Sequence, residues 1–227
     1  MLTYAAVFLP CMQSTKSVLV MSLPKMSTVR PFIHKSKSVS DEPCINILKQ
    51  KFNQSEPNIV WVCDFTYIRA GGIFFYLCVI LDLFSRKVIA YKLSNKIDTQ
   101  LAIDTVNLAV AGRGTSEGII FHTDRGCQFT AKKFRKHLDN LNMVQSFSAK
   151  GHPYDNAVME CFFKYLKNEE TDRKSYYSFQ ELSISLFEYI NGFYNSVRPH
   201  SHNNGLSPNQ AEKIFFYSIF LFFCPIY

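Results

Sequence analysis

The sequence predicts an α/β protein with a mixed five-stranded sheet and helices on both faces. Three long apolar segments between residues 60 and 93 are joined by turns of a few residues, which is typical of an antiparallel meander. After residue 98 the apolar spacing becomes that of amphipathic helices, and these alternate with two more short apolar segments. The order β-β-β-α-β-α-β-α-α therefore predicts three antiparallel strands followed by two parallel ones.

The first three strands are expected at Val60–Ile68, Ile73–Leu83 and Lys87–Leu93. The first of them, VWVCDFTYI, is apolar on both of its alternating faces, as expected of a strand that is covered on both sides. Two glycines follow it and favour a turn, and Ser85 with Arg86 favours a second turn before the third strand.

The next segment begins with a helix, for which Asp98 is the expected N-cap and Gly112 the expected end. Gly118–Thr123 is expected to be a short buried strand that leads into Asp124. Thr130 is expected to open a basic helix, and Met143–Phe147 is the candidate fifth strand.

The last helices are predicted from their capping residues. Asp155 is the expected N-cap of a helix that continues to about Asn168. Ser178 and Glu181 have the spacing of a capping box in front of another apolar stripe. Ahead of the first strand, residues 43–56 could hold a short helix that ends before Pro57.

Three regions are expected along the chain: an N-terminal arm or remnant linker (1–56), a core (57–213) and a Phe-rich tail (214–227). The tail holds five of the 21 phenylalanines, so its composition departs from the rest. It is shorter than the ~20 apolar residues of a membrane-spanning helix. Two interpretations stay open for it: a segment that docks on the core, or a foreign sequence read through after the natural end of the frame.

The amino-acid composition limits the classes of protein to which this chain could belong. With 47% hydrophobic residues the chain has enough apolar side chain for a core, which excludes wholesale disorder. The net charge of +7 favours a polyanionic partner, nucleic acid first and an anionic membrane surface second. The seven cysteines form no C-x-x-C pair, so we expect neither a disulfide framework nor a four-ligand zinc site. We expect a reducing, cytoplasmic compartment.

Three carboxylates stand out by their positions. Asp64 lies in the middle of an apolar strand, where an ionised group is costly unless a cation or hydrogen bonds compensate it. Asp124 ends another apolar strand, where α/β sheets place their ligands. Glu160 is opposite the apolar stripe of its helix and shares a face with Lys164 and Lys167. Taken singly, each acid could instead be a turn residue or a member of an ordinary helical ion pair.

Five segments, in order, resemble the catalytic core of insertion-sequence transposases and retroviral-type integrases, which has a ribonuclease-H-like fold. They are WVCDFTYI (61–68), LDLFSRK (81–87), HTDRGCQF (122–129), KGHPYDNAVMECFFKYLK (150–167) and YNSVRPHSHNNGLS (194–207). The 35 residues between Asp124 and Glu160 match the family's spacing for its last two acids. The resemblance covers about residues 45–213 and is closest to bacterial transposases made from two overlapping reading frames.

The resemblance implies a polynucleotidyl transferase that cleaves phosphodiester bonds and transfers a 3′-OH end into DNA. Asp64, Asp124 and Glu160 would be the catalytic residues and would hold two Mg²⁺ or Mn²⁺ ions, since Mg²⁺ prefers carboxylate oxygens. The residues expected to contact DNA are Lys150, Lys164, Lys167, Arg125 and Arg198. Asp155 and Asn156 would support the site by capping the helix that carries Glu160.

The implied partners are DNA, as element ends and as target, and further copies of the chain when it is active, with no membrane. Cys63, Cys127 and Cys161 stand where the family more often has small hydroxyl residues, but no acid is missing. The alternative is a degraded, non-catalytic copy that only binds DNA or a partner. A ribonuclease-H-type nuclease without strand transfer is a third interpretation, and the segment 150–167 argues against it.

Overall fold

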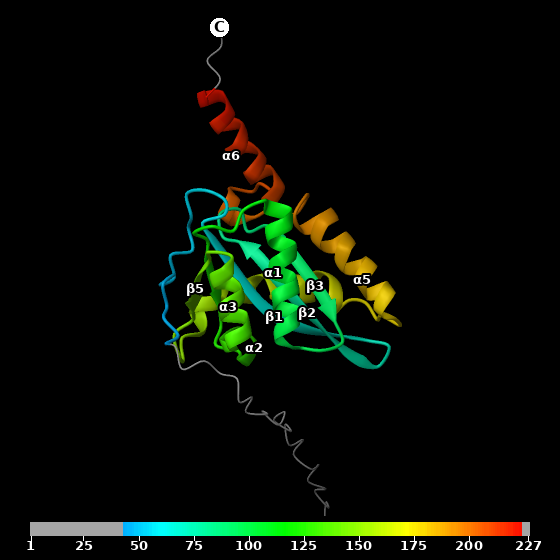
Figure 1. Cartoon of the computed structure of the whole chain (residues 1–227). Helices are drawn as coiled ribbons and strands as arrows, with labels where there is room; N and C mark the ends of the chain where they lie inside the picture. Colours follow the sequence, from blue (N-terminus) through cyan, green and yellow to red (C-terminus); the bar gives the residue numbers. More distant parts are fainter. Residues whose placement is uncertain (1–42, 224–227) are drawn as a thin grey trace, which may run out of the picture. The chain divides into compact units, whose positions relative to one another are not determined.

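A computed structural model describes residues 43–223 of the 227-residue chain (Figure 1). Its sheet has five strands in the order β3-β2-β1-β4-β5. The predicted mixed sheet is confirmed, because β1, β2 and β3 pair antiparallel, whereas β4 pairs parallel with β1 and β5 pairs parallel with β4. Residues 1–42 of the predicted arm and residues 224–227 of the predicted tail lie outside the described residues.

The antiparallel half consists of β1 (Val60–Ala70), β2 (Ile73–Asp82) and β3 (Val88–Ser94). Gly71 and Gly72 form the β1–β2 turn with φ angles of +55° and +82°, a region that favours glycine. A side chain at position 71 would also lie 2.9 Å from the carbonyl oxygen of Tyr177. This turn therefore requires glycine at 71.

The parallel half consists of β4 (Ile120–Thr123) and β5 (Val144–Phe147). In β1 and β4, Val60 lies opposite Ile120 and Cys63 lies opposite Thr123. The chain passes from β3 to β4 through α1 (Thr99–Arg113), so the change to a helical period marks the change from antiparallel to parallel pairing.

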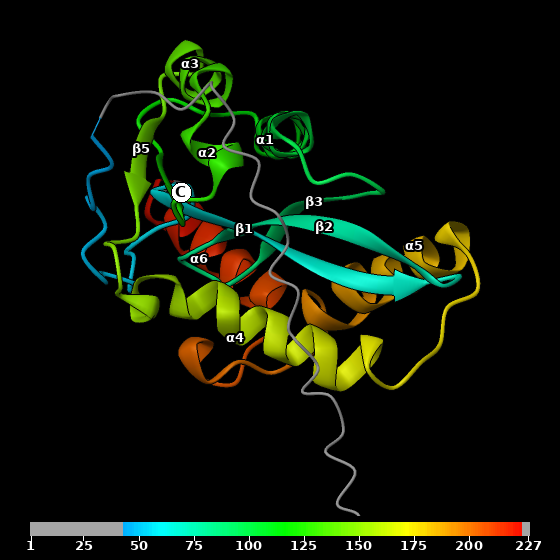
Figure 2. The ribbon, with the colours of Figure 1, turned by 90° about the horizontal axis from the view of Figure 1, so that it is seen from below.

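Helices cover both faces of the sheet, as predicted (Figure 2). One face packs against α1, α2 (Cys127–Thr130) and α3 (Lys132–Asn140). The other face packs against α4 (Ala157–Leu166) and α5 (Phe179–Phe187). Two apolar cores result. The first contains Trp61, Val106, Phe121, Phe134 and Leu138, and the second contains Val62, Leu77, Phe162, Leu166 and Leu186.

Wider helical turns lengthen both helices of the second face. A π-helical turn, Lys167–Thr171, follows α4, and another, Glu188–Tyr194, follows α5. Short 3₁₀ turns at Pro153–Asn156 and Ser201–Asn203 complete the helical segments, together with α6 (Pro208–Phe223).

Some predicted helix ends were wrong. Asp98 caps α1 as predicted and accepts a hydrogen bond of 2.8 Å from the backbone N–H of Leu101. The helix ends at Gly114 rather than Gly112, because Gly114 is the residue with the left-handed conformation, at φ +68°. Thr130 does not open the basic helix but ends α2, and α3 starts at Lys132 without a side-chain cap.

The short helix considered for residues 43–56 does not form. The backbone N–H groups of Ile47 and Leu48 instead donate hydrogen bonds to the hydroxyl of Ser146, at 3.0 and 3.1 Å. Leu48 is buried in the core. Contacts with β5, about 100 residues away, override the local helical preference of this segment.

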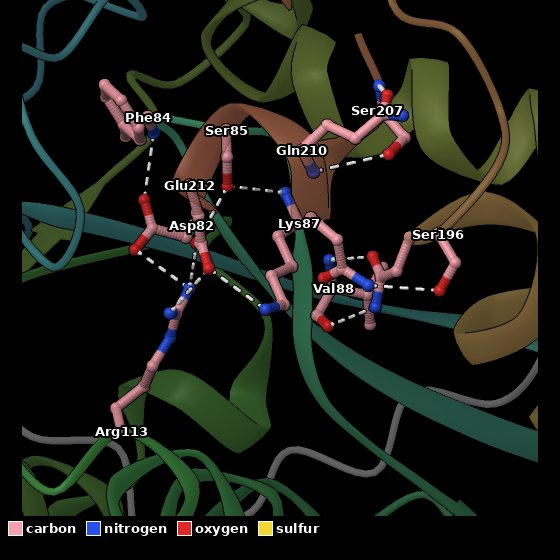
Figure 3. Close-up of polar contacts among 12 residues, drawn as sticks. Asp82, Phe84, Ser85, Lys87, Val88, Arg113, Ser196, Ser207, Gln210 and Glu212 are labelled. Carbon is pink, nitrogen blue, oxygen red and sulfur yellow. Dashed lines mark hydrogen bonds and ion pairs between the residues drawn. The ribbon is translucent and has the colours of Figure 1, made fainter. Parts of the chain in front are cut away.

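The start of α6 is held by a network of buried charges (Figure 3). Glu212 accepts hydrogen bonds from the hydroxyl of Ser85, the ammonium of Lys87 and the guanidinium of Arg113. Asp82 accepts hydrogen bonds from the backbone N–H groups of Asn58 and Phe84. This network therefore ties α6 to the β2–β3 turn and to the end of α1.

Helix α6 is continuous across residue 213, where we expected the core to end. Its exposed side chains include Ile214, Phe216, Tyr217 and Phe220. Within residues 43–223, no helix combines the length and the apolar content that a membrane span needs.

Replacing Glu212 with Ala is expected to lower the free energy of unfolding by about 3 kcal/mol, because the largely buried guanidinium of Arg113 loses its two hydrogen bonds to Glu212 and keeps only the 3.5 Å contact with Asp82. Urea denaturation would measure the change. Glu117 is an exposed glutamate, and Glu117→Ala should change stability by less than about 0.5 kcal/mol. Equal losses in the two variants would contradict the structural role of Glu212.

Candidate active site

Asp64, in β1, and Asp124, directly after the neighbouring parallel strand β4, lie side by side. Each follows by one residue the matched pair Cys63–Thr123 of β1 and β4. Side chains alternate along a strand, and Val62 packs in the α4-side core, so Asp64 faces α4 as well. The parallel pairing thus brings together two acids that are 60 residues apart in the sequence.

Hydrogen bonds orient both carboxylates. Asp64 Oδ1 accepts from the backbone N–H of Phe65, and Oδ2 accepts from the side-chain amide of Asn156, each at 2.7 Å. Asp124 Oδ1 accepts from the backbone N–H of Gly126 at 2.9 Å. These donors favour the charged form of each carboxylate and hold it in one direction.

Burial and mutual repulsion oppose ionisation of the pair. Burial raises the pKa of Asp64 to about 7, and the negative charges of Asp124 and, to a smaller extent, Glu160 add to the rise. The pKa of Asp124 is also raised by burial, while its hydrogen bond from Gly126 lowers it. The site thus has a carboxylate whose ionisation would be favoured by a nearby positive charge.

Glu160 lies on the first turns of α4 with an exposed side chain. Its charge raises the pKa of Asp64, so it belongs to the same electrostatic group. In the described part of the chain, no three His, Cys, Asp or Glu side chains lie close enough together to hold a metal ion. Glu160 is therefore close enough to affect the two aspartates but does not form a three-carboxylate cluster with them.

The capping hydrogen bonds expected of Asp155 and Asn156 do not form. Asn156 is the N-cap residue of α4, but its side chain makes no capping hydrogen bond and instead donates to Asp64. Asp155 accepts from the backbone N–H of Ala149 and from the side chains of Asn46 and Gln50. Asp155 thus fastens the segment before β1 to the loop after β5.

The basic residues near the acids differ in their surroundings. Lys164 and Lys167 line a cavity of about 490 Å³ together with Glu160 and Phe65. Lys150 is exposed in the loop that follows β5. Contact of these lysines with DNA stays a prediction.

Two of the predicted DNA-contacting arginines make protein contacts. Arg125 donates to the carbonyl oxygens of Ser148 and Cys44. Arg198 donates to both carboxylate oxygens of Glu169, and its guanidinium carbon lies 3.8 Å from the centroid of the Tyr165 ring. A DNA contact by either arginine stays a prediction.

His200, next but one to Arg198, is buried against aromatic rings. Its ring meets that of Tyr194 edge-on at 5.0 Å, and its Nε2 atom is buried without a hydrogen-bond partner. Burial, followed by the charge of Arg198, lowers the pKa of His200 to about 4. His200 is therefore uncharged in the folded protein at neutral pH.

This histidine predicts a loss of stability in mild acid. Unfolded chains bind a proton on histidine near pH 6.5, but the folded protein does so only near pH 4, so stability falls as the pH decreases between these values. His200→Phe should reduce the loss between pH 7 and pH 5 by about 1–2 kcal/mol in urea denaturation. A His200→Phe variant with the wild-type pH dependence would contradict the assignment.

Comparison with known protein families shows to which family this chain belongs. The integrase core domain matches the chain in two overlapping segments, residues 54–153 and 141–208. The chain belongs to the integrase core family. The two matches together contain all three acids and the strands and helix that carry them.

Relatives with curated names are transposases. The chain is 40% identical over 168 residues to the transposase InsF for insertion sequence IS3A of Escherichia coli, covering 74% of this chain and 58% of the relative. It is 36% identical over 168 residues to the transposase for insertion sequence element IS904 of Lactococcus lactis, covering 74% and 66%. The chain thus spans about three fifths of the length of the E. coli relative.

Solved structures support the fold. A chain of the simian T-cell lymphotropic virus intasome, solved in complex with PP2A regulatory subunit B56 gamma, matches with a TM-score of 0.54 at 18% identity, covering 77% of this chain and 61% of the other. The catalytic core domain of BIV integrase matches with a TM-score of 0.52 at 15% identity, covering 72% and 99%. The expected ribonuclease-H-like fold is confirmed by these integrase neighbours.

Proposed function

We propose that this chain is the catalytic part of a DNA transposase, which cleaves a phosphodiester bond and joins the resulting 3′-OH end to target DNA. The observation that carries the proposal is the half-buried pair of Asp64, in β1, and Asp124, directly after the adjacent parallel strand β4, with Glu160 close enough to influence the ionisation of Asp64. The transposase relatives support the same chemistry.

The donor chemistry of the three acids fits a hard divalent cation such as Mg²⁺ or Mn²⁺, because it consists of carboxylate oxygens that repel one another without a compensating charge. Asp64, Asp124 and Glu160 would hold the metal, and we expect two ions. When bound, the metal would supply positive charge that stabilises the attacking and leaving oxygens of phosphoryl transfer. Because the side chain of Glu160 is exposed, we expect it to turn toward the pair when a metal ion is bound.

The surrounding residues would orient the acids and the DNA. Asn156 and the backbone N–H of Phe65 fix the direction of the Asp64 carboxylate. Lys164, on the exposed face of α4, and Lys167, directly after α4, would contact phosphates beside the reacting bond, and Lys150 would contact the same backbone from the loop after β5. Association into a homo-oligomer in the active state stays a prediction.

A strand-transfer assay tests the proposed function. A labelled oligonucleotide duplex with a free 3′-OH end is incubated with the protein and a supercoiled plasmid, with Mg²⁺ or with EDTA. We expect labelled, joined plasmid only with the metal. DNA binding without any joined product would instead favour the non-catalytic alternative.

A further inference from the structure

A basic, aromatic groove extends from the candidate active site toward the β1–β2 turn. The cavity that contains Glu160 and Lys164 shares Tyr67, Lys167 and Asp172 with a neighbouring cavity of about 700 Å³. The second cavity is lined by the end of the β1–β2 hairpin and by residues 167–177 after α4. We call the two cavities together the hairpin groove.

The hairpin groove displays aromatic rings to solvent. Tyr67, Phe74 and Tyr177 are 59%, 52% and 83% exposed, although large aromatic side chains are usually buried. The rings of Tyr67 and Phe74 meet edge-on with centroids 5.5 Å apart, and the ammonium of Lys167 lies 5.2 Å from the centroid of the Tyr67 ring. The rings thus form an ordered surface beside a cation.

Positive charge exceeds negative charge along the hairpin groove. Its cations are Arg69, Lys164, Lys167 and Lys174, and its acids are Glu160 and Asp172. The ammonium of Lys174 pairs with Glu170, so three cations remain to face a ligand. Alternating cations and exposed rings match the phosphates and bases of an unpaired strand, whereas a duplex keeps its base faces covered.

The far wall of the hairpin groove is fixed by backbone contacts. The backbone N–H of Gly71 donates to the carbonyl oxygen of Tyr176 at 2.8 Å, and Ala70 forms a β-bridge with Tyr176. The hairpin and the segment after α4 are therefore held together, and the surface exists before any ligand binds.

We propose that the hairpin groove binds the unpaired DNA strand next to the cleaved phosphate, with bases stacked on Tyr67 and Phe74 and phosphates against Arg69 and Lys167. This inference rests on the proposed function, because Glu160 at one end of the groove places it beside the reacting bond. About four nucleotides are expected, the lower limit for single-strand binding sites. Duplexes with a short single-stranded extension therefore bind more tightly than blunt duplexes.

The test compares affinities for labelled duplexes by fluorescence anisotropy at one salt concentration. The duplexes are blunt or carry about four unpaired nucleotides as a 5′ or a 3′ extension. Comparing the two extensions shows which of the two DNA strands occupies the groove. The full chain is expected to bind one of the extended duplexes about tenfold more tightly than the blunt one. Tyr67→Ala should remove most of this preference, and Tyr67→Phe, which keeps the ring, should retain it.

Ile73 supplies the matched control, because it is exposed on the same hairpin but does not line the groove. Ile73→Ala should keep the wild-type preference. Two results would overturn strand binding by the hairpin groove and leave the proposed function standing. One is equal affinity of the full chain for blunt and extended duplexes, and the other is a Tyr67→Ala variant that still prefers the extended duplex as strongly as the wild type. Lack of binding to every duplex would overturn both. Release of a second copy of the chain by Tyr67→Ala, with equal duplex affinities, would assign the groove to a protein partner instead.

Discussion

Asp64→Asn, Asp124→Asn and Glu160→Gln are each expected to reduce strand transfer by about a thousandfold or more. Residues that act as one unit are not additive, so a double variant should be no less active than either single variant. The structure supports this grouping, because the charges of Asp124 and Glu160 both act on Asp64. The joined plasmid product measures the effect in the presence of Mg²⁺.

The matched control for these variants is Glu117→Gln, which changes an exposed glutamate outside the site and should keep wild-type activity. All variants should keep the far-ultraviolet circular dichroism of the native fold. A Glu160→Gln variant with near wild-type strand transfer would remove Glu160 from the catalytic group.

Asp64→Asn is also expected to stabilise the metal-free protein at alkaline pH. The pKa of Asp64 is about 7 in the folded protein, whereas an ordinary aspartate has a pKa of 3.8. Between these two pH values the unfolded chain loses this proton more readily than the folded protein, so the free energy of unfolding falls as the pH rises. Above pH 7 the variant should gain about 1–3 kcal/mol in free energy of unfolding. Below pH 4 the wild-type carboxyl is neutral and the gain should vanish.

Urea denaturation in EDTA at pH 5 and pH 8 measures this effect. Asn156→Ala is expected to have the opposite effect on stability, because it removes the 2.7 Å hydrogen bond that favours the charged form of Asp64. It should therefore lower the free energy of unfolding at pH 8. An Asp64→Asn variant less stable than the wild type at pH 8 would show that the lost hydrogen bonds outweigh the relief of repulsion.

Sequence patterns correctly predicted the strands and helix caps that depend on residues close together in the chain. The alternating apolar strand around Asp64 and the cap at Asp98 were both found from neighbouring residues alone. The adjacency of Asp64 and Asp124 could be expected only from the family resemblance, since no periodicity links residues in different strands. It is the parallel register of β1 and β4 that places them together.

What the sequence could not predict depends on contacts between distant segments. The hydrogen bond from Asn156 to Asp64 joins residues 92 positions apart, and nothing in the local sequence distinguishes it from a helix cap. Asp155 contacts Gln50 across 105 positions, and the same contacts keep residues 43–56 from forming a helix. The hairpin groove was missed for a similar reason, because Tyr67 looks like any strand residue until the segment after α4 lies beside it.

The central claim is that three acids, only two of which lie side by side, act as one site for divalent metal. Direct titration with Mn²⁺, with the free ion followed by electron paramagnetic resonance, tests it most directly. We predict that the wild-type chain binds Mn²⁺ and that Asp64→Asn, Asp124→Asn and Glu160→Gln each weaken binding at least about tenfold, whereas Glu117→Gln does not. Wild-type Mn²⁺ affinity in any of the three acid variants would contradict the single shared site.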